Sequence, residues 1–216
     1  MISKNLKKRI FTSVLLLSVV FLFFNFIQIS VLGVLILGVL SVLEFLNIAK
    51  KIFKNRLYKL LFSLSFIIFI FLFCLLFLYF LNIYELKIII FSILFGCIAS
   101  DIGGFVFGKL FKGPKLTKIS PNKTISGSIG SFIFTCIATS SSIFYFTKYF
   151  SYTLLLVCFF ITIACQLGDL FFSFLKRKAK IKDTGNFLPG HGGILDRLDG
   201  IFFGVPVGIT VLILFY

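Results

Sequence analysis

The stretch IFTSVLLLSVVFLFFNFIQISVLGVLILGVLSVLEFLNIA, residues Ile10–Ala49, decides the fold because it is apolar over almost its whole length. Its 40 residues hold a single charge, Glu44. A helix needs about 20 apolar residues to cross the hydrocarbon core of a bilayer, so the stretch is long enough for two membrane spans. The polar residues Asn25 and Gln28 predict the turn between these spans.

Further apolar runs bounded by polar or charged residues follow along the chain, at Leu60–Leu81, Ile88–Phe107, Ile129–Thr147, Thr153–Leu175 and Leu198–Tyr216. The chain is 59% apolar and 13% charged, whereas soluble domains carry about 25% charge, so the composition excludes both a soluble globule and a disordered chain. The sequence therefore predicts an all-α, polytopic transmembrane helix bundle of about seven spans.

The basic residues alternate between the two ends of the predicted spans. Of the 22 Lys and Arg residues, all except Lys87 and Lys148 lie before span one or in the connections after spans two, four and six. Cytoplasmic loops of membrane proteins carry an excess of Lys and Arg. We therefore expect a multi-pass protein of the cell (inner, cytoplasmic) membrane whose N-terminus and basic connections are cytoplasmic.

The aspartates gather near the last two of these basic connections, at Asp101, Asp169, Asp183, Asp196 and Asp199. Asp101 and Asp169 lie inside apolar runs, where an unpaired carboxylate costs about 2.5 kcal/mol or more. We expect a water-filled cavity occupied by a cation at this depth. A structural ion pair is the alternative.

Asp196 and Asp199 are three residues apart, which places both on one face of the helix that opens the last span. Two carboxylates on one face attract a divalent cation, whereas helix N-capping is the alternative role for Asp196. Mg²⁺ is usually held by one or two carboxylates together with oxygens of a phosphorylated substrate, so Asp169 strengthens the metal interpretation.

Two polar segments next to these helices have the composition of phosphate-binding loops. Small residues at Pro189–Gly193 would let backbone N–H groups approach an anion at a helix N-terminus. Within it, His191 suits either a general acid, base or phosphate contact or a simple loop hydrogen bond. The second segment, Ser120–Thr124, supplies hydroxyls and Lys123, although a basic loop resting on lipid headgroups would have the same composition.

The string SFLKRKAKIKDTGNFLPGHGGILDRLD, Ser173–Asp199, resembles the signature of bacterial phosphatidate cytidylyltransferases, also called CDP-diacylglycerol synthases. Three further elements are similar to motifs of that family: Asp101–Gly104, Ser120–Thr124 and Gly168–Leu170. The resemblance covers Asp101–Gly200. The chain departs from the family pattern at Phe172, which replaces a usual Glu, at Ser126, which replaces an acid, at Phe105, near a usual Tyr, and at Gly200, which replaces a usual Ser.

The resemblance implies transfer of CMP from CTP to phosphatidic acid, which yields CDP-diacylglycerol and pyrophosphate for phospholipid synthesis. It implies that Asp169 and Asp196 bind Mg²⁺, and it leaves a second, monovalent cation open. It implies catalytic roles for Lys176, Arg177, Lys182, Asp183, His191, Arg197 and Asp199. It implies substrate-binding roles for Asp101, Ser120, Pro121, Asn122, Lys123, Thr124, Ser173, Gly192 and Gly193.

On this interpretation the chain is a single integral membrane domain. Residues 1–100 supply the N-terminal spans, and residues 101–216 form the catalytic transmembrane region with two motif loops that face the cytoplasm. The expected partners are CTP, phosphatidic acid, the lipid bilayer and a second copy of the chain in a homodimer. No nucleic acid is expected.

Two other function classes remain open. One is another CTP-dependent lipid enzyme, of the prenol kinase or CDP-archaeol synthase type, and the other is a non-enzymatic membrane cation carrier. A carrier needs charges across the membrane midplane, yet the stretches Leu60–Leu81 and Thr153–Gln166 contain no Asp, Glu, Lys, Arg or His. For Glu44 we expect a buried interhelical hydrogen bond in preference to catalysis.

Overall fold

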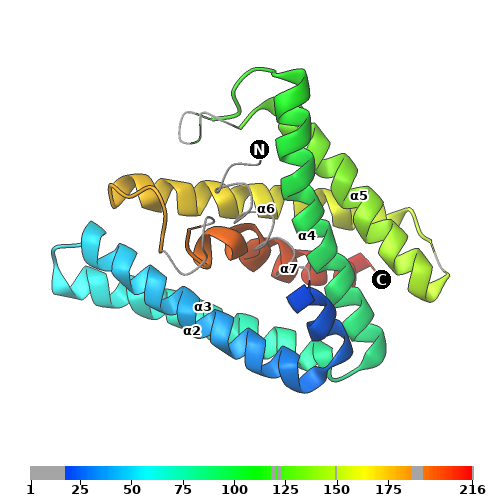
Figure 1. The fold of residues 1–216 in the computed structure, drawn as a ribbon, viewed down its shortest axis with the longest axis horizontal. Coiled ribbons are helices and arrows are strands. Elements are labelled where there is room, and N and C mark those ends of the chain that lie inside the picture. Colours follow the sequence, from blue (N-terminus) through cyan, green and yellow to red (C-terminus); the bar gives the residue numbers. More distant parts are fainter. Residues whose placement is uncertain (1–17, 118–119, 121–122, 149, 186–191, 216) are drawn as a thin grey trace, which may run out of the picture. The chain divides into compact units, whose positions relative to one another are not determined.

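The computed structural model describes residues 18–117, 120, 123–148, 150–185 and 192–215. A helical stretch at residues 18–25 precedes six long helices (Figure 1): α2 (Ile27–Ile52), α3 (Arg56–Leu81), α4 (Tyr84–Phe111), α5 (Ile125–Thr147), α6 (Thr153–Lys178) and α7 (Leu195–Phe215). All six are long and apolar enough to cross a membrane. The predicted all-α, polytopic helix bundle is confirmed.

The predicted turn between the first two spans is also confirmed, because the helix of residues 18–25 ends just before Phe26 and α2 begins at Ile27. The beginning of the predicted first span lies outside the described residues. So do the four basic residues that precede it, Lys4, Lys7, Lys8 and Arg9.

The chain divides into two compact units, each of which is described by itself. Unit 1 contains the described part of the chain up to Asn82 together with Leu175–Leu198, and unit 2 contains Ile83–Phe174 together with residues from Asp199 onward. Helix α6 therefore passes from unit 2 into unit 1, and α7 passes from unit 1 into unit 2. Each unit thus holds one end of both helices that carry the predicted site residues.

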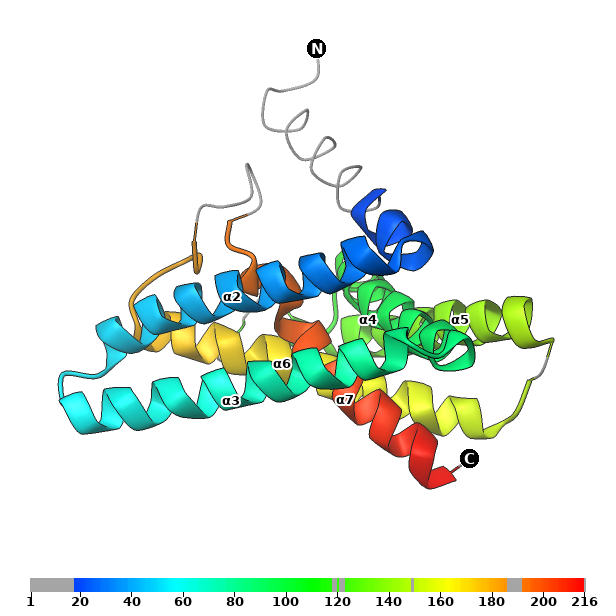
Figure 2. The same cartoon turned by 90° about the horizontal axis from the view of Figure 1, so that it is seen from below.

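In unit 1, α2 and α3 form an antiparallel pair joined by a short connection (Figure 2). The rings of Phe45 on α2 and Phe66 on α3 stack with centroids 3.7 Å apart. At the start of α3, the Asn55 side chain accepts a hydrogen bond from the Leu57 N–H at 2.9 Å and caps the helix. Glu44 lies on the buried side of α2, next to Phe45.

In unit 2, α4 and α5 are antiparallel and approach each other through small residues. A Cβ atom on Gly103 would lie 2.7 Å from Phe134 Cβ and would also collide with the Gly130 carbonyl. The Ser131 hydroxyl donates to the Ser100 carbonyl at 2.8 Å. Close backbone contact and hydroxyl hydrogen bonds stabilise helix pairs in lipid, where the hydrophobic effect between helices is absent.

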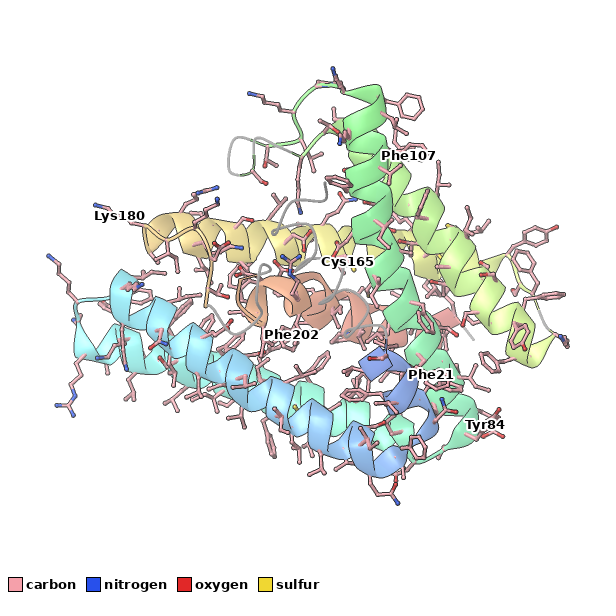
Figure 3. All side chains as sticks on the ribbon, in the orientation of Figure 1. Phe21, Tyr84, Phe107, Cys165, Lys180 and Phe202 are labelled. Carbon is pink, nitrogen blue, oxygen red and sulfur yellow. The ribbon has the colours of Figure 1, made fainter. Side chains whose placement is uncertain are left out.

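Aromatic and small residues complete the packing of unit 2. Phe107 on α4, labelled in Figure 3, meets Phe134 on α5 edge to face, with ring centroids 6.0 Å apart. Between α6 and α7, a Cβ atom on Gly204 would lie 2.5 Å from the sulfur of Cys165 and 2.6 Å from that of Cys97. Helix α7 therefore lies close enough to α6 to put residues of the two helices in direct contact.

Candidate active site

The first candidate group lies in unit 2, where Lys123 pairs with Asp169. Lys123 precedes α5, and its Nζ lies 2.6 Å from Asp169 Oδ2 on α6. The two side chains are 28% and 19% exposed, so the pair is accessible from solvent or a polar ligand. The other carboxylate oxygen, Oδ1, faces α7 at Gly200, where an added Cβ would lie 3.1 Å away.

The connection between α4 and α5 fixes the backbone of Lys123. Its carbonyl accepts a hydrogen bond from Leu116 N at 2.7 Å, and its N–H donates to the Ser120 carbonyl at 3.1 Å. Next along the chain, Thr124 caps α5 by accepting from the Gly127 N–H at 3.1 Å. Thr124, which we predicted to bind substrate, is thus the N-cap of α5. Pro121 and Asn122 lie outside the described residues.

The second candidate group lies in unit 1, where Lys176 near the end of α6 pairs with Asp196 at the start of α7. Lys176 Nζ lies 2.7 Å from Asp196 Oδ1, and the two side chains are 16% and 8% exposed. Asp196 Oδ2 accepts from Thr184 N at 2.8 Å, from Thr184 Oγ1 at 3.0 Å and from Gly193 N at 3.1 Å. Both oxygens of Asp196 are therefore held by donors of the chain.

Glu44 also belongs to this second group. Its carboxylate is buried at 2% exposure and accepts from Ile194 N at 3.0 Å, Leu195 N at 2.9 Å and Thr184 Oγ1 at 2.7 Å. The predicted buried interhelical hydrogen bond is confirmed. Asp196 accepts from the N–H of Gly193, and Glu44 accepts from the N–H groups of Ile194 and Leu195. The anions at the start of α7 are therefore two carboxylates of the chain itself.

Gly192 lets the backbone of the loop before α7 lie close to Asp196 and Asp183. Its φ of +82° lies in the left-handed region, which glycine adopts without a Cβ penalty. A Cβ atom there would lie 3.2 Å from Asp196 Oδ2 and 3.3 Å from Asp183 Cβ. Asp183 is exposed, and its Cβ lies near the same glycine as Asp196 Oδ2; its catalytic role stays a prediction.

The remaining predicted residues take several positions. Lys182, Arg177 and Arg197 are exposed, and Ser173 is half-buried on α6. Asp199 is buried at 8% exposure, and its Oδ1 accepts from the N–H of Gly200 at 3.0 Å. His191, like Pro121 and Asn122, lies outside the described residues.

Asp101 is exposed on α4 and belongs to unit 2, as does Asp169 on α6. Cys165, labelled in Figure 3, is on α6, one turn before Asp169. Unit 2 therefore brings Lys123 and Asp169 together, and unit 1 brings together Lys176, Asp183, Gly192, Gly193 and Asp196.

Sequence reasoning missed Thr184 and the place of Glu44 beside Asp196. A signal was present for Glu44, because a lone carboxylate in an apolar run must find hydrogen-bond donors, and the first turn of a helix supplies free N–H groups. For Thr184 no such signal exists, since a threonine in a polar loop is ordinary.

The carboxylates fit a magnesium ion, which needs hard oxygen ligands. In the described part of the chain no three His, Cys, Asp or Glu residues come together as a metal group. One or two carboxylates nevertheless suffice when substrate phosphates complete the coordination. Asp169 and Asp196 each already attract a cationic group, at 2.6 and 2.7 Å, and an ionised carboxylate has lone pairs for a second partner.

The fold and these two groups define a class: a polytopic α-helical membrane protein that presents lysine-paired carboxylates beside polar loops. The chain belongs to the cytidylyltransferase family, whose model matches residues 2–215.

Curated relatives carry a more specific name. The chain is 40% identical over 126 residues to the phosphatidate cytidylyltransferase of Mycobacterium leprae, an alignment of 58% of this chain and 40% of the relative. It is 41% identical over 125 residues to that of Helicobacter pylori, covering 55% and 44%. It is 44% identical over 115 residues to that of Rickettsia bellii, covering 50% of each chain. The match thus spans about half the length of these relatives or less.

At the position of Phe172 the resemblance implies an acid. The side chain is 0% exposed. It meets Phe171 and Phe203 edge to face, with ring centroids 5.2 and 6.3 Å away. In this chain the position is therefore an apolar packing site, and the carboxylates of unit 2 are left without that neighbour.

Proposed function

We propose that the protein transfers CMP from CTP to phosphatidic acid, which gives CDP-diacylglycerol and pyrophosphate. The observation that carries the proposal is the pair of lysine-bound aspartates, Lys123–Asp169 and Lys176–Asp196, inside motifs that resemble those of phosphatidate cytidylyltransferases. Relatives at 40 to 44% identity are named phosphatidate cytidylyltransferase, which supports the same activity.

The reaction needs little covalent chemistry from the protein. A phosphate oxygen of phosphatidic acid bonds to the α-phosphorus of CTP, and the bond from that phosphorus to the oxygen bridging to the β-phosphate breaks. Pyrophosphate leaves with the electron pair. Because phosphatidate is already anionic near neutral pH, deprotonation of the nucleophile is a minor problem, and positioning and charge stabilisation dominate.

Asp169 and Asp196 are the residues that would hold Mg²⁺ in this proposal, together with oxygens of the substrate phosphates. Bound there, the ion would neutralise charge that builds on the departing pyrophosphate. The structure supports both assignments separately, since each carboxylate binds one lysine ammonium through one oxygen, and that oxygen keeps a lone pair for a metal. A second, monovalent cation is proposed from the resemblance alone.

The basic residues would bind the phosphates. Lys123 and Lys176 are already held beside the two aspartates, and each can move from its carboxylate to a phosphate oxygen once a metal neutralises that carboxylate. Arg177 and Lys182 are exposed in unit 1, so their side chains are free to reach a triphosphate or lipid phosphate. Arginine can bind such a group through two parallel hydrogen bonds.

The multi-pass membrane location follows from the six apolar helices. We place the active site on the cytoplasmic side because the Lys and Arg residues concentrate in the connections after α2, α4 and α6, as the positive-inside rule requires. CTP is then met on the side where it is made. A homodimer through apolar spans is proposed from the resemblance and would be tested by the mass of the protein in nanodiscs.

A turnover assay tests the proposed function. Purified protein in nanodiscs would receive radiolabelled CTP, Mg²⁺ and phosphatidic acid, and we expect pyrophosphate and a labelled lipid in equal amounts. Omission of phosphatidic acid or of Mg²⁺ should stop both products. The variant Lys54→Ala is the matched control, because it changes a basic residue in a connection without aspartates and should remain active.

Other products would identify the other functions. Formation of CDP from CTP with a prenol as acceptor would identify a kinase, and reaction restricted to archaeal ether lipids would identify a CDP-archaeol synthase. Absence of any CTP turnover in well-folded protein would contradict the proposal and would favour the cation carrier.

A further inference from the structure

Glu44 connects three segments of unit 1 that are distant in sequence. It lies on α2, and its carboxylate accepts from the N–H groups of Ile194 and Leu195 at the start of α7. It also accepts from the hydroxyl of Thr184, which is 140 residues away in the chain. With 2% exposure, the carboxylate is removed from solvent, so these donors replace the water that would otherwise surround it.

Two glycines of the motif make room for this carboxylate. A Cβ atom on Gly193 would lie 2.5 Å from Glu44 Oε2, and a Cβ atom on Gly185 would lie 2.9 Å from Glu44 Cδ. Real Cβ contacts are not that short, so an alanine at either position would displace the carboxylate. The two glycines of the motif therefore leave space for the carboxylate of Glu44, which comes from α2 and lies outside the motif in sequence.

The charge of Glu44 is balanced by backbone dipoles. Within the described residues the structure records two ion pairs, and Glu44 takes part in neither of them. Its two N–H donors are instead the first amides of α7, where the helix dipole favours an anion. Removal of the Glu44 carboxylate would leave the buried N–H groups of Ile194 and Leu195 without this acceptor, which is costly.

Thr184 joins Glu44 to Asp196. Its Oγ1 lies 2.7 Å from Glu44 Oε2 and 3.0 Å from Asp196 Oδ2, and its N–H donates to the same Asp196 oxygen at 2.8 Å. A hydroxyl has one hydrogen, so it donates to one carboxylate at a time. The loop that carries Thr184 is thus attached to both acids, and Asp196 sits between this loop and Lys176.

We propose that Glu44 is a positioning residue for Asp196, because its carboxylate fixes the first turn of α7 and the Thr184 loop in the geometry that Asp196 needs to bind a divalent cation. This inference rests on the proposed function for the identity of the cation and its nucleotide. It assigns a role to a residue of the N-terminal half, whereas the resemblance places every functional residue between Asp101 and Gly200.

The consequence is measurable as metal affinity. Residues that orient a metal ligand through hydrogen bonds typically change metal affinity or activity by about 10- to 100-fold when they are replaced. We expect a loss of that size for Glu44→Gln, which keeps the shape of the side chain but puts an NH₂ group against an N–H or hydroxyl donor. Thr184→Val should have a similar effect because it removes the hydroxyl and keeps the volume.

The experiment compares four variants with wild type in nanodiscs: Glu44→Gln, Thr184→Val, Thr184→Ser and Ser41→Ala. Ser41 is the matched control, because it lies one turn from Glu44 on α2, is 0% exposed and donates to its own helix at the Leu37 carbonyl. Binding of Mn²⁺ is measured by electron paramagnetic resonance, and hydrogen exchange is followed at residues 192–198. The Mg²⁺ concentration for half-maximal turnover is a third readout.

We expect weaker Mn²⁺ binding and faster exchange in Glu44→Gln and Thr184→Val. Thr184→Ser, which keeps the hydroxyl, and Ser41→Ala should remain within about twofold of wild type. A purely structural role would lower the melting temperature of Glu44→Gln and leave the Mn²⁺ affinity of the folded fraction at the wild-type value, which would overturn the inference. If Glu44→Gln does not fold, Thr184→Val decides the question by the same criterion.

Failure of the proposed function gives a different result. Wild-type protein that binds Mn²⁺ in a Glu44-dependent manner but does not turn over CTP would contradict the cytidylyltransferase activity and would leave the positioning role supported. Wild-type protein that binds no Mn²⁺ would overturn both the positioning role and the metal assignment. Turnover with a Mg²⁺ requirement unchanged by Glu44→Gln would overturn the positioning role alone.

Discussion

Asp196 in unit 1 and Asp169 in unit 2 each pair with one lysine, at 2.7 and 2.6 Å, yet their other surroundings differ. From the described residues Asp196 also accepts from the backbone N–H groups of Thr184 and Gly193, and it shares the Thr184 hydroxyl with Glu44. Among the same described residues, Asp169 accepts no hydrogen bond beyond that of Lys123, and its second oxygen faces Gly200, which has no side chain to donate.

This difference separates two ways of presenting a carboxylate to a ligand. Asp196 is fixed before any substrate arrives, because a loop, a helix start and a lysine all restrain it, and Glu44 restrains the first two. In the described part of the chain, the restraint on Asp169 is one flexible lysine side chain, so we expect it to turn toward a ligand at little cost. A fixed carboxylate provides preorganised charge, whereas an adjustable one can follow the substrate.

The largest expected effect is on catalysis and is the same for both aspartates. Asp169→Ala and Asp196→Ala should each lower CTP turnover at least about 1,000-fold, which corresponds to about 4 kcal/mol of lost stabilisation in the transition state. Each substitution removes the charge of a proposed metal ligand, and in unit 2 the apolar Phe172 cannot replace it. Formation of labelled CDP-diacylglycerol measures the loss. Wild-type activity of Asp169→Ala at low Mg²⁺ would disprove its metal role and break the comparison.

The next effect is on stability and should differ between the two aspartates. Asp196→Asn leaves Lys176 without its counter-ion in a largely buried setting, and we expect a loss of about 3 kcal/mol. Asp169→Asn disrupts a more exposed pair, so we expect about 1 kcal/mol or less. Thermal unfolding in detergent, followed by circular dichroism, measures both. Equal losses would show that the additional donors to Asp196 do not stabilise unit 1.

Basic residues provide a smaller but discriminating effect. Arg177→Ala or Lys182→Ala should lower kcat/KM at least about 100-fold, since a cation that contacts charge developing in the transition state contributes several kcal/mol. Lys54→Ala, in the connection after α2, should remain within a few-fold of wild type because it serves orientation and lipid attraction. Equal, small losses in all three would show a solvated basic face instead of a substrate site.

The helices could be predicted from the sequence because membrane insertion depends on the apolarity of local segments. Their first residues were less predictable, since helix starts depend on caps. The apolar run that begins at Leu60 is part of a helix that starts at Arg56, because Asn55 caps it. The run that begins at Leu198 belongs to a helix that starts at Leu195, where the cap is the carboxylate of Glu44 from another helix.

The site was predictable to the extent that it lies in contiguous motifs. Lys176, Asp196 and Gly193 are within 20 residues of one another, and the structure brings them together. The contact of Glu44 with Thr184 joins residues 140 positions apart, so it depends on tertiary packing that local patterns do not encode. A buried carboxylate must accept hydrogen bonds, so the sequence indicates that donors exist, but it does not identify them.

The smallest expected effect sharpens the comparison by giving Asp169 a second donor. Gly200 lies where the resemblance implies a Ser, and a Cβ atom there would be 3.1 Å from Asp169 Oδ1. The contact is tight, but the atom that must shift is the end of a rotatable carboxylate. A serine hydroxyl at this position can therefore donate to Asp169 and hold it, as Thr184 and Gly193 hold Asp196.

We expect Gly200→Ser to lower the Mg²⁺ concentration for half-maximal turnover by a few-fold. This is less than the effect of about 10-fold or more that is typical of residues that orient metal ligands. Gly200→Ala is the matched control, because it adds the same Cβ atom without a donor and should give no such gain. The measurement is a Mg²⁺ titration of CTP turnover for wild type and both variants. A gain in both variants would attribute the effect to packing on α7, whereas a gain in neither would show that the mobility of Asp169 does not limit metal binding. A gain in the serine variant alone would show that a second donor makes the carboxylate of unit 2 behave more like that of unit 1.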